Sequence, residues 1–521
     1  MAPNNHDPLI LTIDVGTQSV RASLFDKQGT CLSMEKESYE PAYYSSKPGY
    51  AEIDADEYFD YMSKAIRRLT EKKPNLVERI AGITIDTFRD SAVLLDAENK
   101  PLRPIILWLD SRMAKCEKKL PLWSRFLFAL VGKTYTVEVN RRRSMMNWVK
   151  ENEPEIFGKV AKYVNVSTYL IYRLTGKLVD TASSYSGHYP LDYKKGQFYK
   201  NPTKHLQGQV FSVRKDQLCP LVEPGVPLGG IQADVAKDFG LPEGLPLLVA
   251  GSDKTCETLG VGVIDTSMAA ISLGTAATIE TTTRKYVESI KFLPSFMNVI
   301  PNSYNMDIQI YRGFWMVNWF LREFAAMQID DLFAESDPAH FNARINDVPP
   351  GCDGLVLQPF WGSPLDRPEV KGSMIGFSDG ITREHIYRAI IEGIAFELRY
   401  DYGVLNHQLK GKFKPKEIRL SGGGAKSDEV CQIFADVFGI PTTRVQTIET
   451  SSLGAAIAGF VNLKEFASPE EAIASMVHKK DTFVPNPETH AIYDDIFKNA
   501  YLPLYPSLKK VYRYIFASRL K

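Results

Sequence analysis

The chain has 521 residues, of which 44% are hydrophobic and 24% charged, as in globular proteins with sizeable cores. This length predicts three or four domains or two large α/β lobes, and it excludes a disulfide-stapled mini-protein. The 62 Lys and Arg residues balance the 62 Asp and Glu residues to a net charge of zero, so we expect no nucleic-acid partner.

The amino-terminal segment 1–8 lacks a basic stretch leading into an apolar core, so it does not resemble a secretory signal. The longest apolar run, 126–131, is far shorter than the roughly 18 residues of a membrane-spanning helix. Six scattered cysteines without a Cys-x-x-Cys pair favour reduced thiols in packing roles over a zinc site or disulfides. These features predict a cytoplasmic protein without a membrane partner.

Two segments in different halves of the chain share one design. Residues 9–26 predict two strands joined by a tip at Gly16-Thr17, and residues 269–280 predict the same around Gly274-Thr275. This repeat predicts two related halves, each opening with a hairpin whose tip offers backbone amides and a hydroxyl. We place the boundary near residue 255, which gives domains 1–255 and 256–521.

Strands and helices intermix along the rest of the chain. Helical periodicity is clear in 56–69 and in 383–398, where isoleucines recur every four residues. Short apolar runs followed by polar or glycine residues predict strands at 80–85, 105–109, 247–250 and 417–421. The pattern indicates an α/β fold.

The clearest local signal is the glycine-rich bend that follows strand 417–421. The segment Gly422-Gly423-Gly424-Ala425-Lys426-Ser427 leads into a predicted helix from Asp428 that stops at Gly439. Glycines let a ligand approach the backbone, and the free amides of the helix start, capped by Ser427 or Asp428, suit a nucleotide. A plain tight turn would look the same, and Ala425 before Lys426 excludes a Walker A loop.

Two aspartates stand at the ends of predicted strands. Asp253 follows strand 247–250, where a side chain faces the crevice in which α/β proteins bind ligands. Its carboxylate suits a general base for a hydroxyl or a magnesium contact, and a helix N-cap is the alternative. Asp14 precedes the first tip, where it suits a metal-bound water beside phosphates. The alternative for Asp14 is a solvent-facing hairpin carboxylate.

Two adjacent strand ends each present an arginine and an aspartate: Arg89-Asp90, and Asp110 with Arg112. A guanidinium beside a carboxylate can donate to and accept from vicinal hydroxyls, as recognition of a sugar or polyol requires. Ordinary surface ion pairs would give the same pattern.

Three further patterns have simpler explanations. The triplet 141–143 of arginines is expected to be a solvated helix start, and Trp315 and Trp319 are expected to form a core-facing helix stripe. Residues 376–380 match the G-x-S-x-G pattern of hydrolases, but the helix predicted after Thr382 begins too late for an elbow at Ser378. A serine hydrolase using Ser378 is therefore a weaker alternative.

Taken in order, these motifs resemble those of the FGGY family of carbohydrate kinases over nearly the whole chain. Residues 13–21 resemble its first phosphate motif, 271–275 its second, and 251–253 the segment with its catalytic aspartate. Residues 421–441 resemble the adenosine motif, and 449–459 the small-residue helix that follows. Arg89-Asp90 departs from both the Arg-Glu pair of glycerol kinases and the Met-His pair of many xylulokinases.

The resemblance implies two actin-like, ribonuclease-H-like domains with an ATP cleft between them. It implies ATP-dependent phosphorylation of a ketose such as xylulose or of a small polyol, with Asp253 accepting the proton and Asp14 and Asp253 holding Mg²⁺. An actin-like ATPase that acts on a protein partner without a sugar is the alternative, and the oligomeric state is left open, a homodimer included. The residues implied to bind ATP are Gly16, Thr17, Gln18, Ser19, Arg21, Gly274, Thr275, Gly423, Gly424, Ala425 and Ser427. The residues implied to bind substrate are Arg89, Asp90, Asp110 and Asp253.

Overall fold

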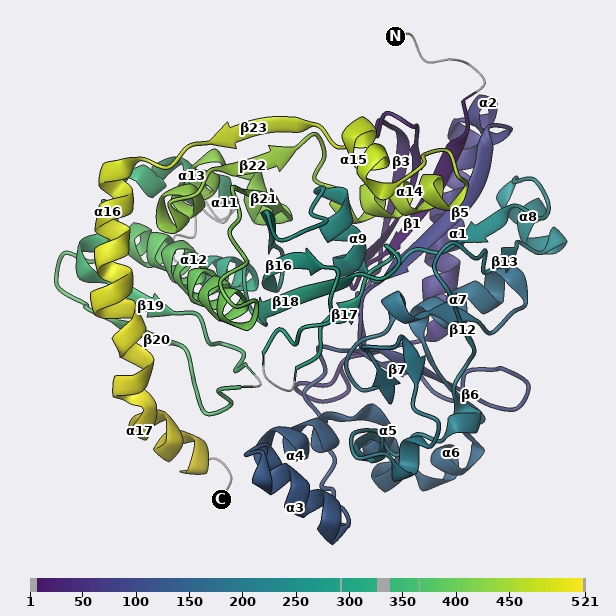
Figure 1. Ribbon diagram of the computed structural model, residues 1–521, viewed down its shortest axis with the longest axis horizontal. Coiled ribbons are helices and arrows are strands. Elements are labelled where there is room, and N and C mark those ends of the chain that lie inside the picture. The colour runs from purple at the N-terminus through teal and green to yellow at the C-terminus, as the bar shows by residue number, and fades with distance from the viewer. Residues whose placement is uncertain (1–6, 291–292, 326–337, 365, 519–521) are drawn as a thin grey trace. The chain divides into compact units, whose positions relative to one another are not determined.

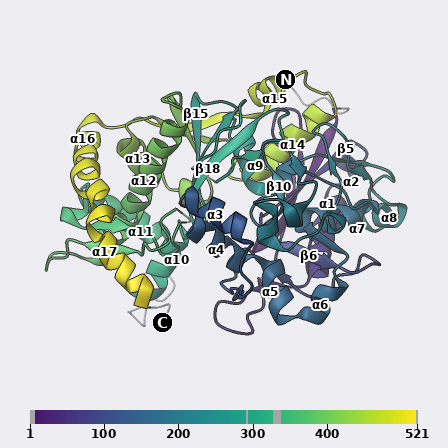
Figure 2. The same ribbon diagram turned by 60° about the horizontal axis from the view of Figure 1, so that its bottom comes forward.

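The computed structural model describes residues 7–290, 293–325, 338–364 and 366–518. The chain forms two compact units: unit 1 comprises residues 1–260, 296–304 and 451–477, and unit 2 comprises residues 261–295, 305–450 and 478–521. Both units combine sheets with helices, which confirms the predicted α/β class (Figure 1, Figure 2).

Unit 1 is organised around a six-stranded sheet of order β13-β14-β5-β1-β2-β3. Strand β1 pairs antiparallel with β2, which confirms the first hairpin, and parallel with β5, which in turn pairs parallel with β14. All seven residues of β1 are buried, as expected for a central strand covered on both faces. The strands are β1 (Leu9–Val15), β2 (Ser19–Phe25), β3 (Cys31–Ser38), β5 (Ile80–Thr87), β13 (Gly229–Gly230) and β14 (Pro246–Leu248).

Helices from distant parts of the chain cover this sheet. Helix α1 (Ala55–Lys72) packs on β2 and β3 and buries an apolar stripe that includes Tyr58, Met62 and Leu69. Helix α14 (Thr450–Asn462) belongs to the same unit, and both views place it beside the purple strands (Figure 1, Figure 2). A side chain at its Gly459 would meet Ile10 of β1 and Thr84 of β5. The other helices here are α7 (Val166–Thr175), α8 (Ala233–Phe239), α9 (Asp253–Gly260) and α15 (Pro469–Met476).

A smaller sheet and a helical segment complete unit 1. The sheet order is β4-β7-β6-β8. Its strands are β4 (Glu52–Ile53), β6 (Ala92–Leu95), β7 (Ile105–Ile106) and β8 (Lys162–Asn165), and the helices are α3 (Leu122–Leu130), α4 (Thr134–Arg143), α5 (Met145–Asn152) and α6 (Pro154–Lys159).

Unit 2 repeats the strand arrangement of unit 1. Its strands follow the order β18-β16-β15-β21-β22-β23, and β15 pairs antiparallel with β16 and parallel with β21. The order β18-β16-β15-β21-β22 therefore matches β3-β2-β1-β5-β14, which is the internal repeat that the two hairpins predicted. The strands are β15 (Met268–Leu273), β16 (Ala277–Thr283), β18 (Tyr304–Ile310), β21 (Glu417–Ser421), β22 (Thr442–Val445) and β23 (Lys479–Phe483).

One apolar cluster forms the core of unit 2. Helix α12 (Arg383–Gln408) packs against α13 (Asp428–Phe438), and Ile394 and Phe434 are fully buried between the sheet and the outer helices. Helix α12 runs ten residues beyond the predicted end at Leu398. The remaining helices are α10 (Trp315–Phe320), α11 (Pro338–Arg344), α16 (Pro487–Ile496) and α17 (Leu502–Ser518).

Two sequence predictions need correction. The arginines 141–143 form the last turn of α4, not a helix start, and Arg141 is buried and donates to the carbonyl oxygen of Lys118. Cations suit this end because the carbonyl end of a helix is negative. Cys31 is exposed, whereas the other five cysteines are buried as expected of packing residues.

Ser378 is exposed and precedes the start of α12, so it does not lie on a strand-to-helix elbow, as the sequence predicted.

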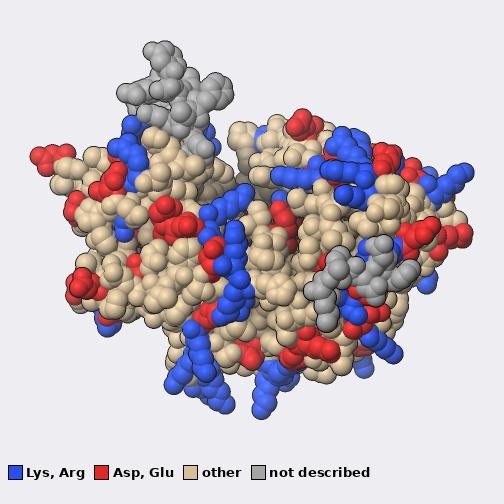
Figure 3. Space-filling model, turned by 90° about the horizontal axis from the view of Figure 1, so that it is seen from above, with Lys and Arg blue, Asp and Glu red and all other residues tan. Residues whose placement is uncertain are grey.

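None of the described helices combines the length and the apolar character that crossing a bilayer requires. On the face seen in Figure 3, acidic and basic side chains both occur, and neither sign covers it alone.

Candidate active site

Three aspartates lie at the carboxyl ends of three neighbouring parallel strands in unit 1. Asp14 in β1 stands directly opposite Asp86 in β5, because the two strands pair in register. Asp253 begins α9 five residues after β14 ends at Leu248, and Ser252 forms a parallel β-bridge with Thr87 of β5. Carboxyl ends of parallel strands are where α/β proteins bind their ligands. The fold therefore brings the two predicted aspartates, Asp14 and Asp253, to one edge of one sheet.

Asp86 is the member of this cluster that sequence reasoning did not assign to the site. Its side chain is fully buried, and in the described part of the chain neither carboxylate oxygen has a hydrogen-bond partner. Burial, followed by the negative charges of Asp14 and Asp253, raises the pKa of Asp86 well above its ordinary value. The available signal was its position at the end of strand 80–85, but its pairing with Asp14 depends on strand register.

The charges around Asp253 favour proton transfer. Burial raises the pKa of the Asp253 carboxyl, while Lys254 and Arg89 act in the opposite direction. A raised pKa moves a carboxylate toward the range in which a general base works at neutral pH. Asp14 is balanced by Arg21, whose Nη1 donates to Oδ2 at 3.4 Å. The cluster thus combines a base candidate with two further carboxylates.

The tip of the first hairpin follows directly after the β1 residues that include Asp14. The Gly16 amide donates to the carbonyl oxygen of Ser19 at 3.0 Å, and the Thr17 hydroxyl accepts from the Trp108 indole at 3.0 Å. The carbonyl oxygen of Gln18 accepts from the Tyr39 amide. Of the predicted phosphate-binding residues, Gly16, Thr17, Gln18, Ser19 and Arg21 all lie in this hairpin of unit 1.

The predicted sugar residues have different surroundings. Both carboxylate oxygens of Asp110 are occupied: they accept from Arg112, and Oδ2 also accepts from the Ala51 amide at 2.6 Å. This supports the ion-pair alternative for Asp110. The Arg89 guanidinium lies 4.8 Å from the ring centre of Phe296, and the carboxylate of Asp90 contacts His188.

Unit 2 brings the second tip and the glycine-rich bend together. Ser272 of β15 stands opposite Ser421 of β21, so Gly274 and Gly422 follow neighbouring strand ends. Gly422 has a φ of 81°, and a side chain there would come within 2.8 Å of the Leu273 carbonyl carbon. Only glycine fits such a position.

The segment before α10 and the start of α13 complete this second arrangement. The carbonyl oxygen of Gly274 accepts from the Phe314 amide at 3.0 Å, and a side chain at Gly424 would collide with the Phe314 ring. The Ser427 hydroxyl caps α13 by accepting from the Val430 amide, as expected. Ala425 is buried, its amide donates to the carbonyl oxygen of Gly422 at 3.2 Å, and its carbonyl oxygen accepts from Arg444.

The aspartates of unit 1 suit a divalent cation whose other ligands are water and phosphate oxygens. In the described part of the chain, no three His, Cys, Asp or Glu side chains are arranged to hold a metal ion. Mg²⁺ usually takes one or two protein carboxylates and completes its shell with water and phosphate oxygens. Asp14 and Asp253, beside the buried carboxyl group of Asp86, match that requirement.

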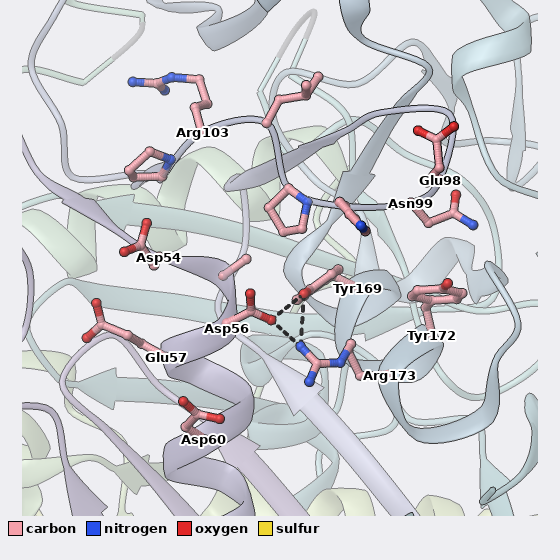
Figure 4. A pocket seen from close by; sticks show the side chains of 15 residues that line it. Asp54, Asp56, Glu57, Asp60, Glu98, Asn99, Arg103, Tyr169, Tyr172 and Arg173 are labelled. Carbon is pink, nitrogen blue, oxygen red and sulfur yellow. Dashed lines mark hydrogen bonds and ion pairs between the residues drawn. The ribbon is translucent and has the colours of Figure 1, made fainter.

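A pocket of about 740 Å³ lies elsewhere in unit 1, at the start of α1 (Figure 4). Asp56 points toward Tyr169 and Arg173 of α7 and accepts hydrogen bonds from both. These contacts join α1 to α7. The pocket shares no lining residue with the sites predicted from the sequence.

Comparisons with known proteins agree along the chain. Models of the FGGY family of carbohydrate kinases match residues 9–260 with the N-terminal domain and residues 269–463 with the C-terminal domain. The xylulose kinase of Lactococcus lactis subsp. lactis is 27% identical over 496 residues, covering 94% of this chain and 95% of that protein. The uncharacterized sugar kinase YgcE of Escherichia coli is 29% identical over 498 residues, covering 95% and 93%. The crystal structure of gluconate kinase from Lactobacillus acidophilus has a TM-score of 0.79 at 24% identity, covering 98% of this chain and 100% of that one.

Proposed function

Because the chain belongs to the FGGY family of carbohydrate kinases, we propose that it transfers the γ-phosphoryl group of ATP to a hydroxyl of a ketose such as xylulose or of a small polyol. The chain is a sugar kinase, a phosphotransferase with an alcohol group as acceptor. The observation that carries the proposal is the group of Asp14, Asp86 and Asp253 at the carboxyl ends of adjacent strands, in which Asp14 and Asp86 are buried.

In this proposal Asp253 takes the proton of the attacking hydroxyl. Its raised pKa and its place at the start of α9 suit that role. Asp14 and Asp253 would hold Mg²⁺, which neutralises the charge of the phosphates when it is bound. The backbone amides at the Gly16-Thr17 and Gly274-Thr275 tips would bind phosphate oxygens, and the Gly423-Gly424 bend would receive the adenosine. Positioning and electrostatics would account for most of the rate enhancement.

The finer choice of substrate rests on the relatives and on the side chains near Asp253. One similar protein is named a xylulose kinase and another a gluconate kinase, and the second acceptor carries a carboxylate whereas the first is uncharged. The positive charge of Arg89 is opposed by the negative charge of the Asp253 carboxylate. This charge balance favours a neutral polyhydroxylated acceptor.

ADP release by the full-length chain tests the proposal directly. ATP and excess Mg²⁺ are supplied with ketopentoses, ketohexoses, glycerol, pentitols or gluconate, one at a time. We expect release to depend on one ketose or polyol and to be negligible without an acceptor. Preference for gluconate would contradict the substrate class, and hydrolysis indifferent to every acceptor would indicate an ATPase without a sugar substrate.

A further inference from the structure

Asp90, which the family resemblance implies to bind substrate, is paired with His188, which has no role so far. Asp90 follows β5 by three residues and has a φ of 59°, a left-handed conformation that is uncommon outside glycine. Its carboxylate lies against Gly187, where a side chain would come within 2.2 Å of the Asp90 Cγ atom. Gly187 itself has a φ of 77°. A strained aspartate is thus fitted closely against the backbone that carries His188, which points to a functional constraint.

The carboxylate of Asp90 fixes the orientation and the protonation of the imidazole. Nδ1 of His188 lies 3.0 Å from Oδ1 and 2.9 Å from Oδ2, and the His188 amide donates to Oδ1 at 2.9 Å. An ionised carboxylate only accepts hydrogen bonds, so Nδ1 carries a proton. In the neutral imidazole, Nε2 then has a free lone pair directed away from Asp90.

The Nε2 atom has no hydrogen-bond partner among the residues that the structure describes. It is buried, while the whole side chain is 13% exposed. The Phe211 ring packs edge-on against the imidazole, with 5.9 Å between the ring centres. A buried polar atom without a partner costs about 1–3 kcal/mol. Histidines that bind metal ions are oriented in the same way, by a carboxylate at one ring nitrogen that leaves the other nitrogen for the ligand.

Sequence neighbours connect this pair to the proposed acceptor site. Arg89 immediately precedes Asp90, and its charge acts on the Asp253 carboxyl. On the basis of the proposed function, we propose that Nε2 of His188 accepts a hydrogen bond from a non-reacting hydroxyl of the sugar, and that Asp90 is the positioning residue that fixes the imidazole. Asp90 would then act on the sugar through His188, not by direct contact.

Two substitutions of His188 distinguish the contribution of Nε2 from that of Nδ1. In His188→Asn the amide can still donate to Asp90, but nothing replaces Nε2, whereas the longer side chain of His188→Gln places an amide near Nε2. We expect His188→Asn to raise the KM for the sugar about ten-fold or more and to leave the KM for ATP within two-fold. His188→Gln should recover most of this loss. His205→Asn is the matched control, because His205 stacks on Tyr199 in the same unit and has no proposed role.

Asp90→Asn tests the positioning role. The Asp90 oxygens fix which ring nitrogen is protonated, and an amide nitrogen in place of Oδ2 would donate to Nδ1 and move the proton to Nε2. Long-range ¹H–¹⁵N NMR of the histidine-labelled protein reports the tautomer. We expect the Nδ1–H form of His188 in the unaltered chain, the Nε2–H form in Asp90→Asn, and a weakened sugar KM in that variant.

The outcomes separate this inference from the proposed function. If the unaltered chain phosphorylates a sugar and His188→Asn leaves its KM unchanged, the inference is wrong and the function stands. If no sugar or polyol is phosphorylated, both fail. Should the variants not fold, a titration of the unaltered labelled chain with the accepted sugar, without ATP, decides. A shift of the His188 Nε2 resonance supports the inference, and an unmoved resonance at saturating sugar overturns it.

Discussion

At the scale of single residues, the two sheets carry different chemistry at equivalent positions. Asp14 and Asp86 face each other across β1 and β5, and Ser272 and Ser421 face each other across the matching strands β15 and β21. Carboxylates can hold a cation or take a proton. Serine hydroxyls next to a glycine backbone carry no charge and suit hydrogen bonds to a nucleotide. We therefore expect the chemical step at this edge of the sheet in unit 1 and nucleotide binding at the matching edge in unit 2.

Replacement of Asp253 by asparagine tests the proposed base. The amide keeps the size of the side chain but cannot accept the hydroxyl proton, so we expect turnover to fall by about 10²–10⁴-fold. ATP binding, measured by calorimetry, should persist. The control is Asp216→Asn, an exposed position on the same unit. Turnover close to that of the control would remove Asp253 from this role.

Asp401 gives a prediction for pH dependence. Burial, followed by the negative charge of Glu397, raises its pKa well above the ordinary value, although Arg367 opposes this. The folded chain then holds the proton more tightly than the unfolded chain. Its contribution to stability is therefore present below the unfolded pKa of about 3.9 and is lost as pH rises through the raised folded pKa.

Asp401→Asn should remove this loss, because the amide does not ionise. We expect the variant to match the unaltered chain near pH 4 and to become progressively more stable than it toward pH 8. Each kcal/mol corresponds to about 2–4 °C in Tm for domains of this size. Melting curves at several pH values check the trend, and parallel curves for the two proteins would contradict it.

At the scale of elements, α9 and α14 pack with their backbones in contact. A side chain at Gly454 of α14 would come within 1.8 Å of the Cys256 carbonyl oxygen in α9. The Ser451 hydroxyl also donates to the carbonyl oxygen of Asp253 at 3.3 Å. Helix α14 therefore sets the position of the helix whose first residue is the proposed base.

Gly454→Ala should separate these two helices. We expect a loss of at least about 1–3 kcal/mol in the free energy of unfolding, together with reduced turnover, since α9 begins at Asp253. Gly403→Ala is the matched control, because Gly403 lies inside α12 and an added Cβ would have no described atom of another segment within 4 Å. There alanine should stabilise the helix by up to about 1 kcal/mol. Equal melting temperatures for the two variants would show that the close approach is unimportant.

The sequence predicted most accurately those helices and strands whose ends are marked by nearby residues. Strand β21 has the predicted bounds, and α13 runs from Asp428 to its stop before Gly439, because glycines and an apolar helical face mark both ends. The extension of α12 beyond Leu398 was missed, because its buried face continues through the polar Asp401 before Leu405, which interrupts the apolar pattern. The arginines 141–143 were placed at the wrong helix end because charge alone does not distinguish a first turn from a last one.

The side-chain partners at the site could not be predicted in the same way. Asp90 and His188 are 98 residues apart in sequence, and Asp14 meets Asp86 only through strand register. Aspartates at strand ends were a sufficient signal for Asp14 and Asp253, but the saturation of Asp110 by Arg112 and a backbone amide depends on tertiary structure. The assigned roles of all these residues remain predictions until the variants are measured.

At the scale of the whole molecule, the compact units are not continuous stretches of chain. Unit 1 needs residues 451–477 in addition to residues 1–260 and 296–304. Ala455, Ala456 and Phe460 of α14 are buried, and Gly459 lies against β1 and β5. A boundary drawn once along the sequence therefore does not reproduce the compact units, although the proposed division at residue 255 follows the internal repeat.

A fragment ending at residue 260 should therefore be defective. Without α14 it exposes the apolar surface around Ile10 and Thr84 to water, so we expect strong binding of a hydrophobic dye and no cooperative melting. Fusion of residues 451–477 to the fragment through a flexible linker should restore a cooperative transition. Cooperative melting of the fragment without the added segment would show that α14 is dispensable.

This discontinuity also bears on how the protein is made. Translation proceeds at about 5–20 residues per second, so about 10–40 s separate the synthesis of residue 260 from that of residue 477. During that interval the nascent sheet of unit 1 lacks the helix that covers β1 and β5. The growing polypeptide therefore exposes the hydrophobic face of β1 and β5 while it is still on the ribosome. A chaperone that binds this face until α14 emerges would raise the yield of native enzyme.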